Sequence, residues 1–302
     1  MRRLGLVGAG RWGRNIVRTI AESRRAKLVC VASRNPGTAD ILPRDCRIVD
    51  DWYDLISDVD LDGVIVATPP ALHPQIVLFA LEAGLSVLVE KPLALTVEEA
   101  GEIRARAAVS AGLLMVDHTY LFHPAWTELK RRRPQLGPVR AIRSVGGNWG
   151  PFRAETTVLW DWGPHDVSMC IDLIEGMPEA VSARRVRTEQ TPEGRGELLH
   201  LILDFEKTRA EVKIGNIMST RTRLFEVEFA GATVIIDDTA EHKLRCGGRA
   251  IPIADTRPLT AVIDAFIDAI AGESFDNQGL DLAVRVVDTL ELCDAALEAR
   301  PR

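Results

Sequence analysis

The chain has 302 residues, of which 46% are hydrophobic and 26% are charged, and its formal net charge is -6. These proportions are those of an ordinary globular protein, and the length is sufficient for two domains. The negative charge argues against a nucleic-acid-binding protein, which usually presents a basic face.

The cysteines and the apolar runs of the sequence indicate in which cellular compartment the protein is expected. Cys30, Cys46, Cys170, Cys246 and Cys293 are scattered and form no Cys-x-x-Cys pair. This pattern argues against a disulfide framework and against a zinc site, so no metal is expected. No apolar run approaches the ~18 residues of a membrane span, and the N-terminus resembles a strand rather than a signal peptide. We therefore expect a cytoplasmic protein with no membrane partner.

The first 118 residues alternate short apolar runs with helical patterns. The expected strands are 4–7, 28–32, 63–67, 86–89 and 113–116, and the expected helices are 11–23, 74–83 and 96–111. Thr96 and Glu99 form a capping box, and Gly84 and Gly112 follow helix ends. Continuous apolar strands that alternate with helices predict a parallel sheet covered on both faces.

The second half has a different pattern. The expected helices are 124–133, 164–174, 259–271 and 279–299, and the expected strands are 139–146, 180–188, 198–205, 210–217, 224–230 and 233–237. Consecutive strands joined by short turns predict a largely antiparallel sheet. The fold class is therefore α/β, with a domain of residues 1–120 followed by a domain of residues 121–302.

The densest basic run is Lys130-Arg131-Arg132-Arg133, directly before Pro134. We expect a helix to end there, because cations complement the C-terminal end of the helix dipole. A solvated helix end is favoured over a phosphate site, which stays open as the alternative.

A glycine-rich motif lies at the start of the chain. Gly8-Ala9-Gly10-Arg11-Trp12-Gly13 matches G-x-G-x-x-G, follows a strand and opens a helix. Gly8 permits the tight turn, Gly10 lets the backbone approach a pyrophosphate, and Gly13 allows close packing of helix and strand. The motif predicts that these six residues bind NAD or NADP; an ordinary glycine-rich turn is the alternative.

The end of the second strand predicts which cofactor is preferred. An Asp or Glu there would bind the ribose 2′-hydroxyl of NAD, but this chain has Ser33-Arg34-Asn35. Arg34 can pair with a 2′-phosphate and Ser33 can donate to it, which favours NADP. Arg34 stacked on adenine, without discrimination, is the alternative.

Three further motifs complete a family pattern. They are Ala67-Thr68-Pro69-Pro70 with His73, Glu90-Lys91-Pro92, and Asp161-Trp162-Gly163-Pro164-His165-Asp166. With the glycine loop they resemble, over essentially the whole chain, the glucose–fructose oxidoreductase and inositol dehydrogenase (Gfo/Idh/MocA) family. Residues 117–124 also resemble the family's domain crossover, although Thr119 and Leu121 stand where the family often has Asn and Arg.

The resemblance implies an NAD(P)-binding Rossmann domain and a substrate-binding α/β domain with a large open sheet. One face of that sheet often forms the subunit interface, so a homodimer or homotetramer is expected. The resemblance also implies a sugar or polyol substrate, and it places Thr68, Pro69, His73, Glu90 and Lys91 around the cofactor. His118 faces the nicotinamide by family position.

Oxidation of a secondary alcohol needs a hydride acceptor and a base for the hydroxyl proton. Lys91 follows a parallel strand, where ligands bind in such sheets, and its cation would stabilise a developing alkoxide. His165 is the candidate acid/base, because imidazole titrates near neutral pH. We expect Pro164 at the first helical position and His165 in the first turn. Asp161, four residues before His165, either orients the imidazole, binds substrate or caps the helix.

Trp149, Arg153 and Trp160 lie near this motif in the sequence. Indole faces pack on sugar rings, and a guanidinium can meet a phosphate or carboxylate, although core packing is an equal alternative for each Trp. Gly150-Pro151-Phe152-Arg153 with residues 160–166 resembles family members that act on nucleotide-linked sugars. The leading function is a dehydrogenase of such a sugar, and an inositol or free-monosaccharide dehydrogenase is the alternative. A non-catalytic NAD(P)-binding sensor is the alternative of another class.

Overall fold

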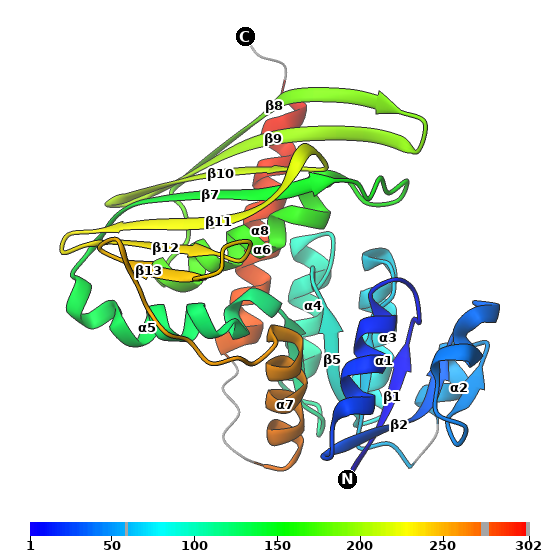
Figure 1. The fold of residues 1–302 in the computed structure, drawn as a ribbon. Helices are drawn as coiled ribbons and strands as arrows, with labels where there is room; N and C mark the ends of the chain where they lie inside the picture. The colour runs from blue at the N-terminus through cyan, green and yellow to red at the C-terminus, as the bar shows by residue number, and fades with distance from the viewer. Residues whose placement is uncertain (58–59, 273–277, 300–302) are drawn as a thin grey trace. The chain divides into compact units, whose positions relative to one another are not determined.

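The computed structural model describes residues 1–57, 60–272 and 278–299, and the chain divides into two compact units (Figure 1). The first unit comprises Met1–Thr119 and Pro258–Val284, and the second comprises Tyr120–Arg257 and Arg285–Arg302. Each unit has its own sheet. Among the described residues, no helix is both long and apolar enough to cross a bilayer.

The first unit is built on a parallel sheet of six strands in the order β3-β2-β1-β4-β5-β6. The strands are β1 Arg2–Val7, β2 Ala26–Ala32, β3 Arg47–Val49, β4 Gly63–Val66, β5 Ser86–Glu90 and β6 Leu114–Asp117. Buried aliphatic side chains on both faces of β1, β4 and β5 form the centre of the core. This strand order is that of dinucleotide-binding folds, whose ligands lie beyond the carboxyl ends of the strands where the order reverses.

The helices of the first unit are α1 Gly13–Glu22, α2 Trp52–Ile56, α3 His73–Glu82, α4 Val97–Ala107 and α7 Pro258–Ile270. Thr96 caps α4 by accepting a hydrogen bond from Glu99 N at 3.2 Å. Helix α4 ends four residues earlier than expected, because a turn tied by Ser110 precedes β6. The Ser110 hydroxyl donates to Leu81 O at 2.8 Å and accepts from Gly112 N at 3.1 Å.

Helix α7 joins the first unit, although the predicted boundary placed everything after residue 120 in the second domain. Arg25, before β2, forms ion pairs with Asp264 and Asp268 of α7. A Cβ at Gly63 would come 3.0 Å from the Phe266 side chain, so the helix packs closely on β4. The apolar periodicity predicted the helix but not which of two cores it would join.

The second unit carries the eight-stranded sheet β14-β13-β12-β11-β7-β10-β9-β8. The strands are β7 Val139–Trp149, β8 Ala180–Thr191, β9 Gly194–Phe205, β10 Thr208–Gly215, β11 Ile217–Phe229, β12 Thr233–Asp237, β13 Leu244–Cys246 and β14 Arg249–Ala250. Among the described strands of this sheet, only β7 and β10 pair in parallel, so the predicted, largely antiparallel sheet is confirmed. Alternate residues of β9 and β10, such as Leu201 and Val212, are fully buried, which is the period expected for a sheet with one covered face.

Two helices of the second unit correct the sequence analysis. Helix α5, Pro124–Leu136, runs through Pro134 instead of ending before it, and α6, Val158–Ile174, begins six residues before Pro164. Each proline therefore lies inside a helix, where it removes one hydrogen bond. The last helix, α8 Gln278–Glu298, contributes residues to both units.

The basic run of α5 is bound to carboxylates. Arg131 and Arg132 pair with Glu128 of the same helix. Lys130 pairs with Asp172 at 3.1 Å, and Arg133 pairs with Glu175. The run serves as an ion-paired helix face.

Candidate active site

The glycine loop between β1 and α1 has the backbone that a pyrophosphate needs. Gly8 has a φ of 97°, and a Cβ there would lie 2.6 Å from Ala67 O. A Cβ at Gly13 would lie 2.1 Å from Gly8 O, so helix and loop touch directly. At Gly10, by contrast, a Cβ would meet nothing within 4 Å. The open side of the loop therefore lies at Gly10, beside the N-terminal N–H groups of α1, and the residues present fit a dinucleotide.

The side chains of the loop divide between the core and the surface. Ala9 is buried, whereas Arg11 and Trp12 are exposed. The indole Nε1 of Trp12 donates to Glu90 Oε1. This bond joins the glycine loop to the end of β5, where Lys91 follows.

Glu90 forms a buried carboxyl pair with Asp117. The two residues are register partners at the ends of β5 and β6, and their side chains share a hydrogen bond. Burial, followed by the charge of Asp117, raises the pKa of Glu90 well above its usual value of 4.5. The Thr119 hydroxyl donates to Asp117 Oδ1 at 2.6 Å, and this bond partly offsets the effect of burial on the pKa of Asp117. Burial thus favours the protonated form of Glu90, the residue that precedes Lys91.

The loops after β4 and β5 are held together by His73. Its Nδ1 lies 2.8 Å from Pro92 O, and its Nε2 lies 3.0 Å from Thr68 O. The ring is fully buried, and burial lowers its pKa, so His73 positions these loops and exposes no surface of its own. The buried hydroxyl of Thr68 has no hydrogen-bond partner among the described residues, and Pro69 beside it is exposed.

His118 follows β6 and is 3% exposed. Neither ring nitrogen has a hydrogen-bond partner in the described part of the chain. Burial, helped by the charge of Lys91, lowers the pKa of His118 to about 4, so its ring is neutral at pH 7.

The residues after β2 leave one cation exposed. The Ser33 hydroxyl lies 2.8 Å from the Thr38 hydroxyl and also accepts a hydrogen bond from Asn35 N. Arg34 is exposed. The serine is thus held in place while the guanidinium can reach a ligand.

In the second unit, Asp161 and His165 lie on one helix. Asp161 is in the first turn of α6 and His165 is four residues later, so both face the same side of the helix. We expected His165 in the first turn, but the helix begins at Val158 and His165 lies in its second turn. The helix N-cap is Thr157, and Asp161 instead accepts a hydrogen bond from Arg153 Nε at 2.8 Å. The capping role considered for Asp161 is therefore wrong.

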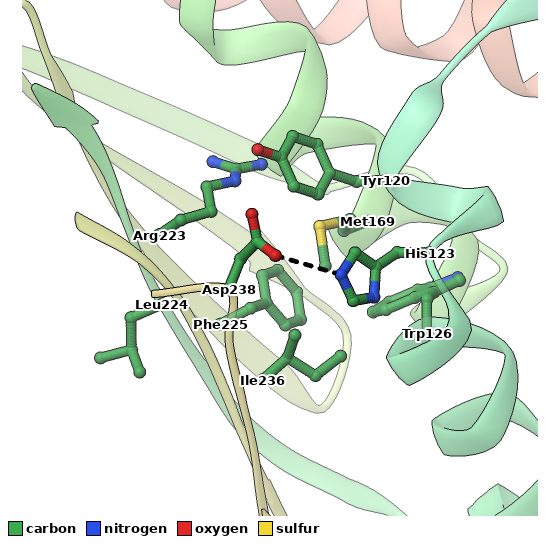
Figure 2. Close-up of a pocket in the computed structure, with 9 residues that line it drawn as sticks. All are labelled: Tyr120, His123, Trp126, Met169, Arg223, Leu224, Phe225, Ile236 and Asp238. Atoms are coloured by element: carbon green, nitrogen blue, oxygen red, sulfur yellow. Dashed lines mark hydrogen bonds and ion pairs between the residues drawn. The ribbon is translucent and has the colours of Figure 1, made fainter. Parts of the chain in front are cut away.

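The His165 ring packs against Tyr120, and Tyr120 in turn lies against the buried Arg223–Asp166 ion pair. The ring of Tyr120 meets the His165 ring edge-on, with centroids 5.0 Å apart. Arg223 lies over the Tyr120 ring at 3.9 Å (Figure 2). Its Nη1 donates to Asp166 Oδ2 at 2.8 Å. Asp166 is fully buried and also accepts a hydrogen bond from Ser144. Asp166, the residue after His165, thus anchors the helix, while the edge-on contact with Tyr120 limits the freedom of the imidazole.

The pocket in Figure 2 is structural. Its volume of about 10 Å³ holds at most one water molecule. His123 lines it, accepts from Ala125 N through Nδ1 as the cap of α5, and lies 3.3 Å from Asp238. Burial tends to raise the pKa of Asp238, but hydrogen bonds from His123 and Lys243 outweigh burial and lower that pKa below its usual value.

The two tryptophans considered for sugar stacking have different positions. Trp149 is 54% exposed and packs edge-on against Phe152, so its indole face is available. Trp160 is buried in α6 and donates to Asp294 Oδ2 at 3.2 Å, so it packs the core.

The structure adds residues that the sequence analysis missed. They are Asp117, Ser144 and Arg223, which reach their partners through strand register, and Tyr120, which lies in the short helical turn 119–122; local motifs encode neither placement. For Asp117 a signal existed, because it ends a strand beside the strand that ends in Glu90. The predicted residues divide between the units: Lys91 and the cofactor residues belong to the first, and Trp149, Arg153, Asp161 and His165 to the second.

Comparison with known proteins agrees with this geometry. The profile of the GFO_IDH_MocA family, described as "Oxidoreductase family, NAD-binding Rossmann fold", matches residues 2–118. The scyllo-inositol 2-dehydrogenase (NAD(+)) of Bacillus subtilis strain 168 is 32% identical over 137 residues, which is 43% of this chain and 39% of that protein. The match thus spans about two fifths of this curated relative.

Two solved structures extend over both units. A protein of Magnetospirillum magnetotacticum MS-1, provisionally assigned as an oxidoreductase, is 38% identical, with a TM-score of 0.92 over 97% of this chain and 99% of that one. The UDP-N-acetylglucosamine 3-dehydrogenase GnnA of Acidithiobacillus ferrooxidans shares the fold, with 23% identity and a TM-score of 0.82 over 98% of each chain. Together, the profile match and the full-length relative show that this chain belongs to the Gfo/Idh/MocA family of oxidoreductases.

Proposed function

We propose that this protein transfers hydride between a nicotinamide cofactor, preferentially NADP, and a secondary alcohol or ketone of a sugar or polyol. The observation that carries the proposal is the glycine loop, which is closed at Gly8 and Gly13 and open at Gly10. It joins β1 to α1, and β1 lies beside β4 where the strand order of the parallel sheet reverses. The exposed Arg34 supports the preference for a 2′-phosphate.

The bound nicotinamide would supply the hydride acceptor or donor. His165 would take up the proton of the substrate hydroxyl, and Asp161, one turn earlier on α6, would orient the imidazole or bind a neighbouring hydroxyl. Lys91 would stabilise the developing negative charge on the alcohol oxygen. The Trp12–Glu90–Asp117 contacts hold the strand end that precedes Lys91, so the lysine is presented from a rigid base.

Two substrate classes remain open within this function. The curated relative named scyllo-inositol 2-dehydrogenase favours a free polyol, and the match spans 43% of this chain and 39% of that protein. The sequence pattern around Arg153 and Trp160, and the shared fold with a UDP-sugar dehydrogenase, favour a nucleotide-linked sugar. The exposed indole of Trp149 suits a sugar ring in either case.

A non-catalytic NAD(P)-binding sensor is the candidate of another class. A sensor needs no acid/base group, so the presence of Lys91, His165 and Asp161 argues against it. The test is a spectrophotometric assay of NADPH or NADH oxidation and of the reverse reaction, with inositols, free sugars and UDP-sugars. Turnover that is lost in His165→Asn supports the enzyme, whereas cofactor binding without turnover of any of these compounds supports the sensor.

The sheet of the second unit is the surface on which we expect a second copy to bind. We propose a cytoplasmic homodimer or homotetramer. Light scattering coupled to gel filtration distinguishes these states from a monomer, and a monomer at micromolar concentration would contradict this part of the proposal.

A further inference from the structure

The segment that follows β2 in the first unit holds its uncharged polar side chains in internal hydrogen bonds. The Ser33 hydroxyl lies 2.8 Å from the Thr38 hydroxyl and accepts from Asn35 N at 3.2 Å. Asn35 Oδ1 accepts from Gly37 N at 3.1 Å and caps the short helix η1, Pro36–Ile41. These side chains are therefore engaged with one another, and a ligand at this strand end has to be bound by other groups.

A cation reaches this segment from α1. Arg14 is the second residue of that helix, and its Nη2 lies 3.4 Å from the position that a Cβ of Gly37 would take. The side chain of Arg14 thus extends from the helix to the segment, into the space that a side chain at Gly37 would crowd. Arg34, three residues before Gly37, is exposed on the same segment. Two arginines that lie far apart in the sequence therefore meet at one strand end.

Both guanidinium groups have their donors available. In the part of the chain that the structure describes, neither Arg14 nor Arg34 forms a side-chain hydrogen bond or an ion pair. Arg14 is half-buried and Arg34 is exposed, so solvent reaches both. A guanidinium carries five N–H donors in a planar fork that matches the oxygens of a phosphate. Two such forks at one place suit a phosphate with two or more free oxygens.

The carboxylates near this strand end do not neutralise the two arginines. The first turn of α1 contains no acidic residue. Asp40 lies near the end of η1, and Asp50 follows Val49, whose carbonyl oxygen accepts from Ser33 N at 2.9 Å. Both carboxylates are exposed, and neither pairs with Arg14 or Arg34 among the described residues. Solvent therefore screens these carboxylates, and the guanidinium groups keep their charge for a ligand.

The place of the two arginines suits the adenosine end of a dinucleotide. In a dinucleotide-binding sheet the adenosine ribose lies beyond the carboxyl end of the second strand. Here that strand end is joined to the glycine loop, because Gly8 N donates to Ala32 O at 3.0 Å. Arg14 lies on the helix that the loop opens. A phosphate on the ribose 2′-oxygen would therefore lie between α1 and the segment after β2, within reach of both arginines.

We propose that Arg14 is a specificity-determining residue, which together with Arg34 binds the 2′-phosphate of NADP or NADPH. The inference rests on the proposed function, whose preference for NADP so far depends on Arg34 alone. Arg14 has the more restricted side chain of the two, since it is half-buried and its backbone belongs to a regular helix. Less conformational entropy is lost when such a side chain binds a ligand, so Arg14 contributes at least as much to the selectivity as Arg34.

The test is calorimetric titration of the full-length protein with NADP, NAD and three adenosine nucleotides. Adenosine 2′,5′-bisphosphate carries the diagnostic phosphate, the 3′,5′ isomer carries it on the neighbouring oxygen, and 5′-AMP lacks it. Arg14→Gln and Arg34→Gln each remove one guanidinium. The matched control is Arg18→Gln, because Arg18 lies one turn further along α1, is exposed, and forms no ion pair with a described residue.

We expect Arg14→Gln to weaken binding of NADP and of the 2′,5′-bisphosphate at least about tenfold, as the loss of charge-assisted hydrogen bonds predicts. Binding of NAD, of 5′-AMP and of the 3′,5′ isomer should change little, because none of them carries a 2′-phosphate. Arg18→Gln should bind every ligand as the wild type does. The double variant Arg14→Gln/Arg34→Gln should bind NADP no more tightly than NAD.

The inference fails, with hydride transfer as the proposed function still standing, if the wild type binds NAD at least as tightly as NADP. It fails equally if Arg14→Gln weakens the two dinucleotides to the same extent, or neither of them. An effect of Arg18→Gln as large as that of Arg14→Gln would also overturn it, because the general charge of α1 would then set the preference. A wild type that binds no nicotinamide dinucleotide would remove the proposed function and the inference with it. Unaltered thermal unfolding and unaltered NAD binding show that a variant is folded.

Discussion

The buried ion pair behind His165 makes a quantitative prediction about stability. Asp166 is fully buried, Arg223 is 8% exposed at its side chain, and their atoms lie 2.8 Å apart. Asp166→Asn keeps the shape and the hydrogen bond with Ser144 but removes the one carboxylate that pairs with Arg223 among the described residues. A buried charge that loses its partner typically costs about 3–5 kcal/mol. For a protein of this size this cost corresponds to a fall in Tm of roughly 6–20 °C.

The measurement is thermal unfolding followed by circular dichroism, together with urea unfolding. The double variant Asp166→Asn/Arg223→Met should be more stable than Asp166→Asn alone, because methionine removes the orphaned charge. Asp204→Asn is the control, since its pair with Arg209 is exposed and should contribute less than about 1 kcal/mol. Two results would refute the account of this pair. One is a loss of less than about 1 kcal/mol in the free energy of unfolding of Asp166→Asn. The other is a double variant whose loss equals the sum of the losses of the two single variants.

Three further predictions concern catalysis, the cofactor and pH. Lys91→Met and His165→Asn should each lower kcat by about 10²–10⁴-fold with little change in the Kd for NADP, and unchanged turnover in both would contradict the mechanism. Arg34→Gln should weaken binding of NADP more than binding of NAD in parallel titrations; equal effects would exclude pairing with the 2′-phosphate. Because burial and Asp117 raise the pKa of Glu90 above 4.5, the folded chain keeps a proton that the unfolded chain releases, and stability should fall as the pH rises above 4.5. Glu90→Gln should reduce this fall between pH 5 and pH 8 in urea unfolding, whereas the exposed Glu98→Gln should not.

The parts of the fold that rest on local sequence were predictable. The apolar strands of the parallel sheet and the glycine loop depend on residues close together in the chain, so their spacing alone identified them. Strands β3, β13 and β14 were missed, because segments of two or three residues carry no measurable periodicity. The predicted boundary lies at residue 120, and the apolar periodicity gave no sign that α7 belongs to the first compact unit.

Prolines misled the prediction of two helices. Pro164 follows Gly163 and resembles a helix start, yet α6 begins at Val158 and its earlier residues Leu159 and Trp160 are buried. Tertiary packing of that first segment outweighs the hydrogen bond lost at Pro164. In α5, Pro134 is two residues from the helix end, so little of the helix depends on the missing N–H.

The candidate site was predictable only where its residues lie in motifs. Lys91, Asp161 and His165 were identified from short patterns, and the structure places the latter two on one face of α6. Arg223 was not, because it lies on a strand whose register decides which side chains it meets. A single sequence contains no direct record of that register.

Binding of the four nicotinamide dinucleotides to the wild type and to Gly10→Ala tests the central claim most directly. A methyl group at Gly10 meets no atom within 4 Å, so the variant should fold and unfold as the wild type does. The same methyl group would occupy the path by which the backbone approaches the pyrophosphate. Calorimetry with NADP, NADPH, NAD and NADH should show tight binding to the wild type, with the phosphorylated forms preferred, and at least a tenfold loss in Gly10→Ala. Equal binding by the two proteins, or no binding by the wild type, would contradict the claim that this loop holds a nicotinamide dinucleotide.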